Sequence, residues 1–173
     1  IPFYVQPQDA DAIRNDGFTN VIPIEEIKTI DGISIYRTTG HHGFGQIGQM
    51  MGPVSGYVLK AEGFPTVYIM GDCRWEACIR DTVERFNPDY IVVNSGGAIF
   101  PEFSKTDGPI IPDENEVMQI LDELPSHIKL IAVHMDAIDH CQTTRAILRN
   151  EATHHEADMS RLIIPEDGET VVL

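Results

Sequence analysis

The sequence predicts an α/β fold in which a sheet packs between helices. The first half of the chain is rich in short apolar or alternating segments, which are typical of β-strands. From residue 66 onward, buried-strand patterns alternate with segments of helical period, an order that is typical of a sheet packed between helices. At 173 residues the chain is long enough to bury one sizeable core, so a single domain over residues 1–173 is expected.

The N-terminal part should contain one helix and several strands. Residues 7–15 have the pattern of a helix that ends at Gly17. Asp31-Gly32 is a strong turn signal between two strands, and Gly63 marks a second expected hairpin. Strands are expected at residues 1–5, 21–24, 27–30, 33–39, 57–62 and 66–70.

The C-terminal part should alternate helices with strands. Apolar residues over 75–86 recur at helical spacing, and Asn87-Pro88 ends that helix. A second helix is expected between Pro112 and Pro125, and a third over about residues 141–150. Strands are expected at residues 90–93 and 129–133, with strand or extended chain over 161–173.

Composition narrows the classes of partner. The formal net charge of −15, from 27 acidic and 12 basic residues, repels nucleic acid and anionic membrane surfaces, so neither is expected as a partner. Cys73, Cys78 and Cys141 form no C-x-x-C pair, which favours a reducing compartment. No apolar run approaches the roughly 20 residues of a membrane span, and no signal peptide is visible. A cytoplasmic location is therefore expected.

Three expected strand ends carry residues that can bind metal ions. His41 and His42 follow the strand at 33–39, Asp72 follows the strand at 66–70, and His134 follows the strand at 129–133. If these strands are neighbours, imidazoles and a carboxylate meet at one edge, a ligand set for zinc, manganese or iron. The alternative is that Gly71-Asp72 is a simple turn and that the histidines are solvated residues at strand ends.

Polar residues that follow His134 could support such a site. The segment "HMDAIDH", residues 134–140, adds Asp136, Asp139 and His140, which could orient ligands or touch substrate. A polar loop without a function is an equally good interpretation. Elsewhere, Arg37, Lys105 and Arg145 could meet an anionic group of a substrate, although each is more simply a surface charge.

Two glycine-rich segments need separate interpretations. Residues 43–48, "GFGQIG", match a dinucleotide-binding turn, but that motif requires a helix to begin within it. Gly52-Pro53 follows so closely that a loop is expected and nucleotide binding is disfavoured. Residues 94–98, "NSGGA", could form a backbone nest for an anion, but a tight loop is favoured.

Three longer segments resemble metallo-β-lactamase-fold hydrolases, in the branch that includes L-ascorbate-6-phosphate lactonase. They read "TTGHHGFGQIGQMMGPVSGYVLKAEGFPTVYIMGDCRW", "PDYIVVNSGGA" and "IAVHMDAIDHCQTTR". The resemblance extends over essentially the entire chain and implies the C-terminal two thirds of an αββα sandwich. It also implies two divalent metal ions, zinc or manganese, in the complete protein.

The resemblance assigns roles to individual residues. His42 matches the third metal-binding motif of the family, Asp72 matches the carboxylate that bridges the metals and takes part in catalysis, and His134 matches the last ligand. His140 and Arg145 resemble positions near the substrate, and Asp136 is placed with them as a substrate or second-layer residue. His41 has no counterpart in the family pattern.

One family signature, His-x-His-x-Asp-His, does not occur in this sequence. The resemblance implies that it precedes Ile1, so an N-terminal portion of the fold is expected to be missing. Each metal would keep about two ligands from residues 1–173, fewer than the three of a usual catalytic zinc, so this chain alone is expected to be inactive. Such a fragment would expose a sheet edge and apolar surface, which would favour association with itself or another chain.

Two functions from different classes follow. The first is a metal-dependent hydrolase that uses activated water to cleave an ester, lactone or phosphoester of a small molecule. The second is a binding or scaffold protein that kept the fold without a complete metal site. The residues upstream of Ile1 would distinguish them, because an in-frame His-x-His-x-Asp-His supports the enzyme.

Overall fold

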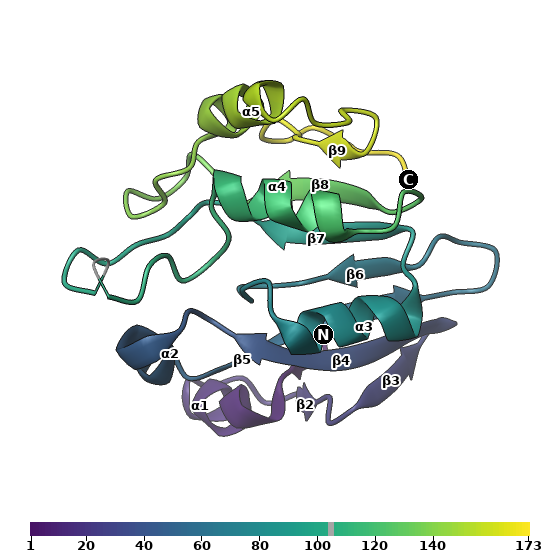
Figure 1. The fold of residues 1–173 in the computed structure, drawn as a ribbon. Coiled ribbons are helices and arrows are strands. Elements are labelled where there is room, and N and C mark those ends of the chain that lie inside the picture. Colours follow the sequence, from purple (N-terminus) through teal and green to yellow (C-terminus); the bar gives the residue numbers. More distant parts are fainter. Residues whose placement is uncertain (104–105) are drawn as a thin grey trace.

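The computed structural model describes residues 1–103 and 106–173. Most strands in this part of the chain join one sheet of seven strands in the order β3-β4-β5-β6-β7-β8-β9, and β1 and β2 form a separate parallel pair (Figure 1). The strands are β1 (Phe3–Val5), β2 (Val21–Pro23), β3 (Ile27–Ile30), β4 (Ile33–His41), β5 (Pro53–Lys60), β6 (Val67–Ile69), β7 (Tyr90–Asn94), β8 (Lys129–Val133) and β9 (Leu162–Ile163).

The helices connect these strands at the positions that the sequence patterns mostly predict. A short 3-10 turn, η1 (Pro7–Asp9), leads into the first α-helix. The α-helices are α1 (Ala10–Asn15), α2 (Gly45–Met51), α3 (Ala77–Phe86), α4 (Glu114–Glu123) and α5 (Arg145–His154). None of the helices among the described residues has the length and apolar character that crossing a membrane requires.

The direction of the strands explains which ends meet. β3, β4, β5 and β6 pair antiparallel in succession, and β6, β7, β8 and β9 pair parallel. Two antiparallel steps separate β4 from β6, so β4 runs in the same direction as β6 and the parallel strands beyond it. The carboxyl ends of β4, β6, β7 and β8 therefore lie along one edge of the sheet.

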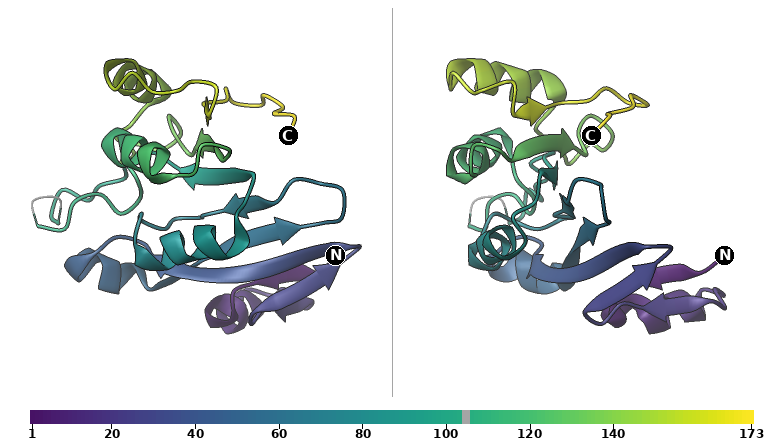
Figure 2. Two further views of the ribbon diagram at one scale, coloured as in Figure 1. Left: turned by 45° about the vertical axis from the view of Figure 1, so that its right-hand side comes forward. Right: turned by 90° about the vertical axis from the view of Figure 1, so that its right-hand side faces the viewer.

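Helices α3, α4 and α5 lie on the same side of the sheet (Figure 2). Each connects two parallel neighbours, and the strand order advances in one direction from β6 to β9. Right-handed crossovers that advance in one direction place their helices on one face. The prediction that helices cover the sheet therefore holds for the face on which α3, α4 and α5 lie.

The main core lies between these helices and the sheet. In β7, Ile91 and Val93 are fully buried, whereas the alternate residues are only partly buried. In β6, Tyr68 is fully buried while its neighbour Ile69 remains 38% exposed. This alternation is what a sheet covered by helices on one face requires, and each buried Val or Ile contributes about 1.5–3 kcal/mol.

Local signals fix where the helices begin and end. α3 ends at Asn87, which adopts a left-handed conformation before Pro88, as the Asn-Pro pair predicts. α4 begins after Asp113, whose side chain accepts a hydrogen bond from the backbone N–H of Glu116 at 2.9 Å. α5 begins at Arg145 because Thr144 caps it at 3.1 Å, so its predicted start near residue 141 was four residues too early.

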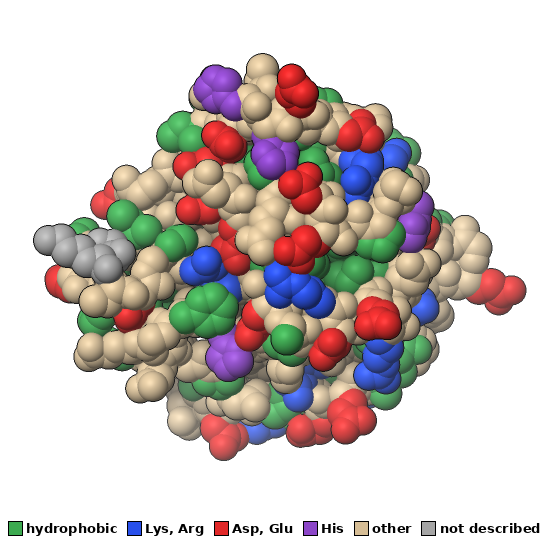
Figure 3. All heavy atoms as spheres, viewed as in Figure 1, with side chains coloured by type: hydrophobic (Ala, Val, Ile, Leu, Met, Phe, Trp, Pro, Cys, Tyr) green, Lys and Arg blue, Asp and Glu red, His purple; other side chains and the backbone are tan. Residues whose placement is uncertain are grey.

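The negative charge is spread over the surface. Acidic side chains are scattered over the face that bears α3 and α4, with Lys and Arg among them (Figure 3). Several acidic groups are held in ion pairs, such as Glu116 with Arg74 and Glu123 with Arg80. On this face the charge accords with a solvated surface better than with one concentrated cation site.

Candidate metal-binding edge

Three predicted ligands follow strands that end at the same edge of the sheet. His42 comes directly after β4, Asp72 lies three residues after β6, and His134 comes directly after β8. One other strand separates β4 from β6, and another separates β6 from β8. The backbones of consecutive ligand-bearing strands are therefore about 10 Å apart, so the loops and side chains must close the remaining distance.

The side chains at this edge are near enough to act on one another's charge. Burial lowers the pKa of the half-buried His42, the carboxylate of Asp72 opposes that shift, and His134 and His140 add to it. A lowered pKa keeps the imidazole neutral at physiological pH, which is the form that binds a metal ion. The structure thus brings His42, Asp72, His134 and His140 into one neighbourhood.

Asp72 is oriented by the strand that lies between the other two. The side-chain amide of Asn94, the last residue of β7, donates a hydrogen bond to Asp72 Oδ1 at 2.7 Å. The loop that follows is tight: Ser95 is fully buried and its backbone N–H donates to the carbonyl of Val133. "NSGGA" therefore acts as a packed turn that presents Asn94 to the carboxylate.

His134 sits on an unusual backbone. Both His134 and Asp136 have positive φ angles, 64° and 62°, a region that side chains other than glycine seldom occupy. The Sγ of Cys141 lies 3.7 Å from Nδ1 of His134, and His140 stacks on Phe100 with ring centroids 5.5 Å apart. The segment after β8 therefore folds back on itself and keeps His140 beside the edge.

His41 belongs to a different environment from His42. It is the last residue of β4, so the strand is longer than the predicted residues 33–39. Its Nδ1 lies 2.8 and 2.9 Å from the two carboxylate oxygens of Glu76, and its backbone N–H donates to the same carboxylate at 2.8 Å. His41 and Glu76 line a groove of about 570 Å³ beside α2, which agrees with the absence of a family counterpart for His41.

Two of the three basic residues considered for substrate binding, Arg37 and Arg145, bond to other groups of the protein. Arg37 donates to the carbonyl of Glu25 at 2.8 Å and to Ser55 Oγ at 3.2 Å. Arg145, with 12% of its side chain exposed, makes ion pairs with Asp136 and Asp167. Lys105 lies outside the described residues. Arg145 thus faces Asp136 and Asp167. That Arg145 and Asp136 lie near the substrate remains a prediction.

The glycine-rich motif at residues 43–48 does contain a helix, and the prediction of a loop was wrong. Helix α2 begins at Gly45 and fits seven residues before Gly52 turns the chain with φ of 75°. Sequence spacing missed it because its cap comes from far along the chain. The carboxylate of Asp107 accepts a hydrogen bond from the backbone N–H of Ile47 at 2.9 Å.

This helix still does not form a dinucleotide site. The motif requires parallel strands on either side of the helix, but α2 connects β4 to its antiparallel neighbour β5. The position that a pyrophosphate would take at the helix N-terminus is filled by Asp107. Hydrogen bonds from the backbone of Ile47, the side chain of Thr106 and the backbone of Gln46 lower the pKa of Asp107.

The cysteines do not have the surroundings of nucleophiles. Burial raises the pKa of the fully buried Cys73 to about 12 and that of Cys78 to about 11. Burial and the neighbouring Asp72 raise the pKa of Cys141 as well. A thiol with a raised pKa has little thiolate at neutral pH, so the structure offers no support for covalent catalysis by cysteine.

The donor chemistry at the edge fits a divalent metal ion, but the ligand set is incomplete. Neutral imidazole and carboxylate groups are the ligands that zinc and manganese take from proteins. Within residues 1–103 and 106–173, however, no three His, Cys, Asp or Glu side chains are arranged so that they could hold an ion. The edge therefore presents donors of the right kind without a closed site.

Two contributors to this edge were missed by sequence reasoning. Asn94 was assigned only to a loop, although its position at the end of a buried strand, like that of Asp72 and His134, was a usable signal. Cys141 was assigned to a helix, but it precedes that helix and contacts His134. No signal in the local sequence indicates this contact, because it depends on how the loop at 134–141 folds back.

Comparison with known proteins identifies close relatives of the chain. No family model matches it. The UPF0173 protein YddR of Bacillus subtilis (strain 168) is 32% identical over 173 residues, which is 98% of this chain and 65% of YddR. The chain therefore spans slightly less than two thirds of the length of this curated relative.

Solved structures agree with the fold. The crystal structure of a "possible metal-dependent hydrolase" from Veillonella parvula DSM 2008 superposes with a TM-score of 0.90 at 31% identity, covering 100% of this chain and 67% of that one. An isothiocyanate hydrolase from Delia radicum gut bacteria gives 0.88 at 34% identity, covering 98% and 66%. The metallo-β-lactamase fold protein YhfI of Bacillus subtilis gives 0.62 at 14% identity, covering 95% and 62%, which bears on the fold alone.

Proposed function

Because this chain belongs to a family of metallo-β-lactamase-fold metal-dependent hydrolases, we propose that it carries part of the active site of a hydrolase that acts on a small molecule. The observation that supports the proposal is the meeting of His42, Asp72 and His134 at one sheet edge, where their charges interact. We propose that these three side chains bind two divalent ions, zinc or manganese. Metal bound there would supply Lewis-acid activation of water and of the substrate's electrophilic group.

The chain's own residues prepare this edge for a cation. Burial keeps His42 neutral, and Asn94 holds the carboxylate of Asp72 in one orientation. We propose that His140, which stacks on Phe100 beside the edge, contacts a bound substrate. Since these groups supply fewer than the three ligands that a catalytic zinc usually takes for each ion, residues 1–173 alone are proposed to be inactive.

The proposed substrates are an ester, a lactone or a phosphoester. The relative from Delia radicum gut bacteria is an isothiocyanate hydrolase, which adds the electrophilic carbon of an isothiocyanate to the groups worth testing. Attack by water on any of these centres places negative charge on an atom that a metal ion stabilises. The groups at this edge therefore support metal-assisted hydrolysis as the reaction class but do not select one substrate.

The experiment compares the full-length protein with Asp72→Ala after loading with zinc or manganese. We expect about two equivalents of metal in the natural protein, as in two-metal hydrolases, and hydrolysis of at least one of the four compound classes. Asp72→Ala should lose activity, whereas Asp81→Ala, at an exposed position on α3, should keep it. Full activity in Asp72→Ala would reject the proposal, and a natural protein that binds no metal would favour the binding or scaffold alternative.

A further inference from the structure

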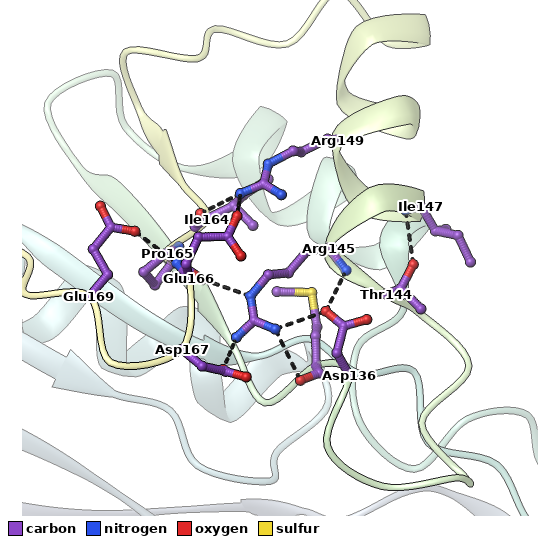
Figure 4. Close-up of polar contacts among 11 residues, drawn as sticks. Asp136, Thr144, Arg145, Ile147, Arg149, Ile164, Pro165, Glu166, Asp167 and Glu169 are labelled. Carbon is purple, nitrogen blue, oxygen red and sulfur yellow. Dashed lines mark hydrogen bonds and ion pairs between the residues drawn. The ribbon is translucent and has the colours of Figure 1, made fainter.

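The C-terminal segment 164–167 is held against helix α5 by two arginines one turn apart (Figure 4). Arg149 donates to the carbonyl of Ile164 at 3.0 Å and to Glu166 at 2.7 Å. Arg145 donates from Nε to the carbonyl of Pro165 at 2.7 Å and pairs with Asp167. Both arginines therefore fasten the same segment, which extends from the end of β9.

Only Arg145 also reaches the loop that carries His134. Its backbone N–H and its guanidinium both donate to Oδ2 of Asp136, at 3.1 and 2.8 Å (Figure 4). The guanidinium also lies 3.4 Å from the carbonyl of Met135. Met135 is 1% exposed and immediately follows His134. The guanidinium thus contacts the two residues that directly follow the predicted ligand.

The loop needs such a restraint because its backbone is strained. His134 and Asp136 both have positive φ angles, a sparsely populated conformation that persists only where the surrounding structure enforces it. Met135 is anchored in the core between them, and Asp136 is anchored by two hydrogen bonds from Arg145. Removing the Arg145 side chain would leave Asp136 with the backbone bond alone, so one end of this strained triplet would be held less firmly.

We propose that Arg145 is a positioning residue that fixes the direction in which His134 points, and that it ties this loop to the C-terminal segment. The inference rests on the proposed function, because it treats His134 as a metal ligand. The guanidinium of Arg145 donates to protein oxygens, so in this proposal it acts through the loop and not by direct contact with metal or substrate. Segment 164–167 supplies the remaining acceptors of the guanidinium, which are the carbonyl of Pro165 and the carboxylate of Asp167.

The test uses Arg145→Ala in the full-length protein, with Arg149→Ala as the matched control. Each variant removes one of the two arginine side chains that hold segment 164–167, but only Arg145→Ala removes the guanidinium bond to Asp136, which then keeps only the bond from the backbone N–H of residue 145. We expect Arg145→Ala to speed hydrogen exchange over residues 134–140 in the metal-free protein and to weaken zinc binding roughly 10–100-fold, the usual effect of losing an outer-layer contact. Arg149→Ala should leave both quantities unchanged.

The direction in which zinc affinity changes when Arg145 is replaced distinguishes a positioning role from a purely electrostatic one. Deleting a positive charge near a cation site should tighten zinc binding if charge is all that matters. Arg145→Lys keeps the charge but lacks the planar fork that reaches several acceptors, so it should bind zinc nearly as weakly as Arg145→Ala. Tighter binding in Arg145→Ala, or full recovery in Arg145→Lys, would overturn the inference.

A second variant covers the case in which Arg145→Ala does not fold. Asp136 has a side chain that is 35% exposed, so Asp136→Ala removes the link from the loop side and leaves segment 164–167 attached. It should also speed exchange over residues 134–140, and unchanged exchange would overturn the inference. If the natural protein binds neither zinc nor manganese, the proposed function fails, but the exchange comparison still decides whether Arg145 positions the loop.

Discussion

The side-chain amide of Asn94 donates a hydrogen bond to Oδ1 of Asp72 across 2.7 Å. Asn94 ends β7 and Asp72 follows the adjacent parallel strand β6, so the contact is set by the pairing of those strands. A donor that holds one carboxylate oxygen leaves the other oxygen free for a cation. Asn94 is therefore the residue that defines how Asp72 faces the edge.

Asn94→Leu should weaken zinc binding by the full-length protein about 10–100-fold, as the loss of outer-layer contacts generally does. The leucine has a similar size but cannot donate, so Asp72 would lose its orientation while the strand keeps its packing. The measurement is zinc affinity by competition with a chelating dye. Asn115→Leu, at an exposed position on α4, is the control, and equal affinities in the two variants would contradict the prediction.

Gly45→Ala should destabilise the protein more than Gly63→Ala. Both glycines have positive φ angles, 62° and 77°, so each alanine carries a conformational cost of about 1–2 kcal/mol. A Cβ on Gly45 would also lie 2.6 Å from Oδ1 of Asp107, whereas a Cβ on Gly63 would meet nothing within 4 Å. Only the first substitution therefore also disturbs the cap of α2.

Urea unfolding of the two glycine variants measures this difference directly. We expect Gly45→Ala to have the lower unfolding midpoint, with similar slopes for both variants. Equal midpoints would mean that Asp107 moves aside without loss and that its bond to Ile47 contributes little.

Titration of the natural protein with a dinucleotide should show no binding, because the N-terminus of α2 already holds a carboxylate.

Sequence periodicity located the strands of the sheet because it depends on local pattern, although β4 extends to His41 and β5 begins at Pro53 and not at the predicted residue 57. Asp72 and His134 follow apolar runs and His42 follows a strand, and the shared direction of β4, β6 and β8 then places all three at one edge whatever the details of the loops. Helix α2 could not be predicted in this way, since Asp107 caps it from 60 residues away. The partners of Arg145 were hidden for the same reason, because Pro165 and Asp167 lie 20 and 22 residues beyond it.

Acid should weaken the contact between α3 and α4 through Glu123. Hydrogen bonds from Arg80, Gln119 and Trp75 lower the pKa of Glu123 to about 2, from an ordinary value of 4.5. A carboxyl whose pKa is lower in the folded protein stabilises the fold while it is ionised. That stabilisation is fully present above about pH 4.5 and is lost as the pH falls toward about 2.

Glu123→Gln should therefore lower the free energy of unfolding at pH 7 and flatten its dependence on pH between about 4.5 and 2. The effect should stay below about 1 kcal/mol, because the side chain is 37% exposed and solvent screens the pair with Arg80. Unfolding followed by circular dichroism across this pH range measures it. Glu84→Gln, at an exposed position on α3, should keep the pH dependence of the natural protein. If Glu123→Gln kept it as well, the three hydrogen bonds to Glu123 would contribute nothing to acid stability.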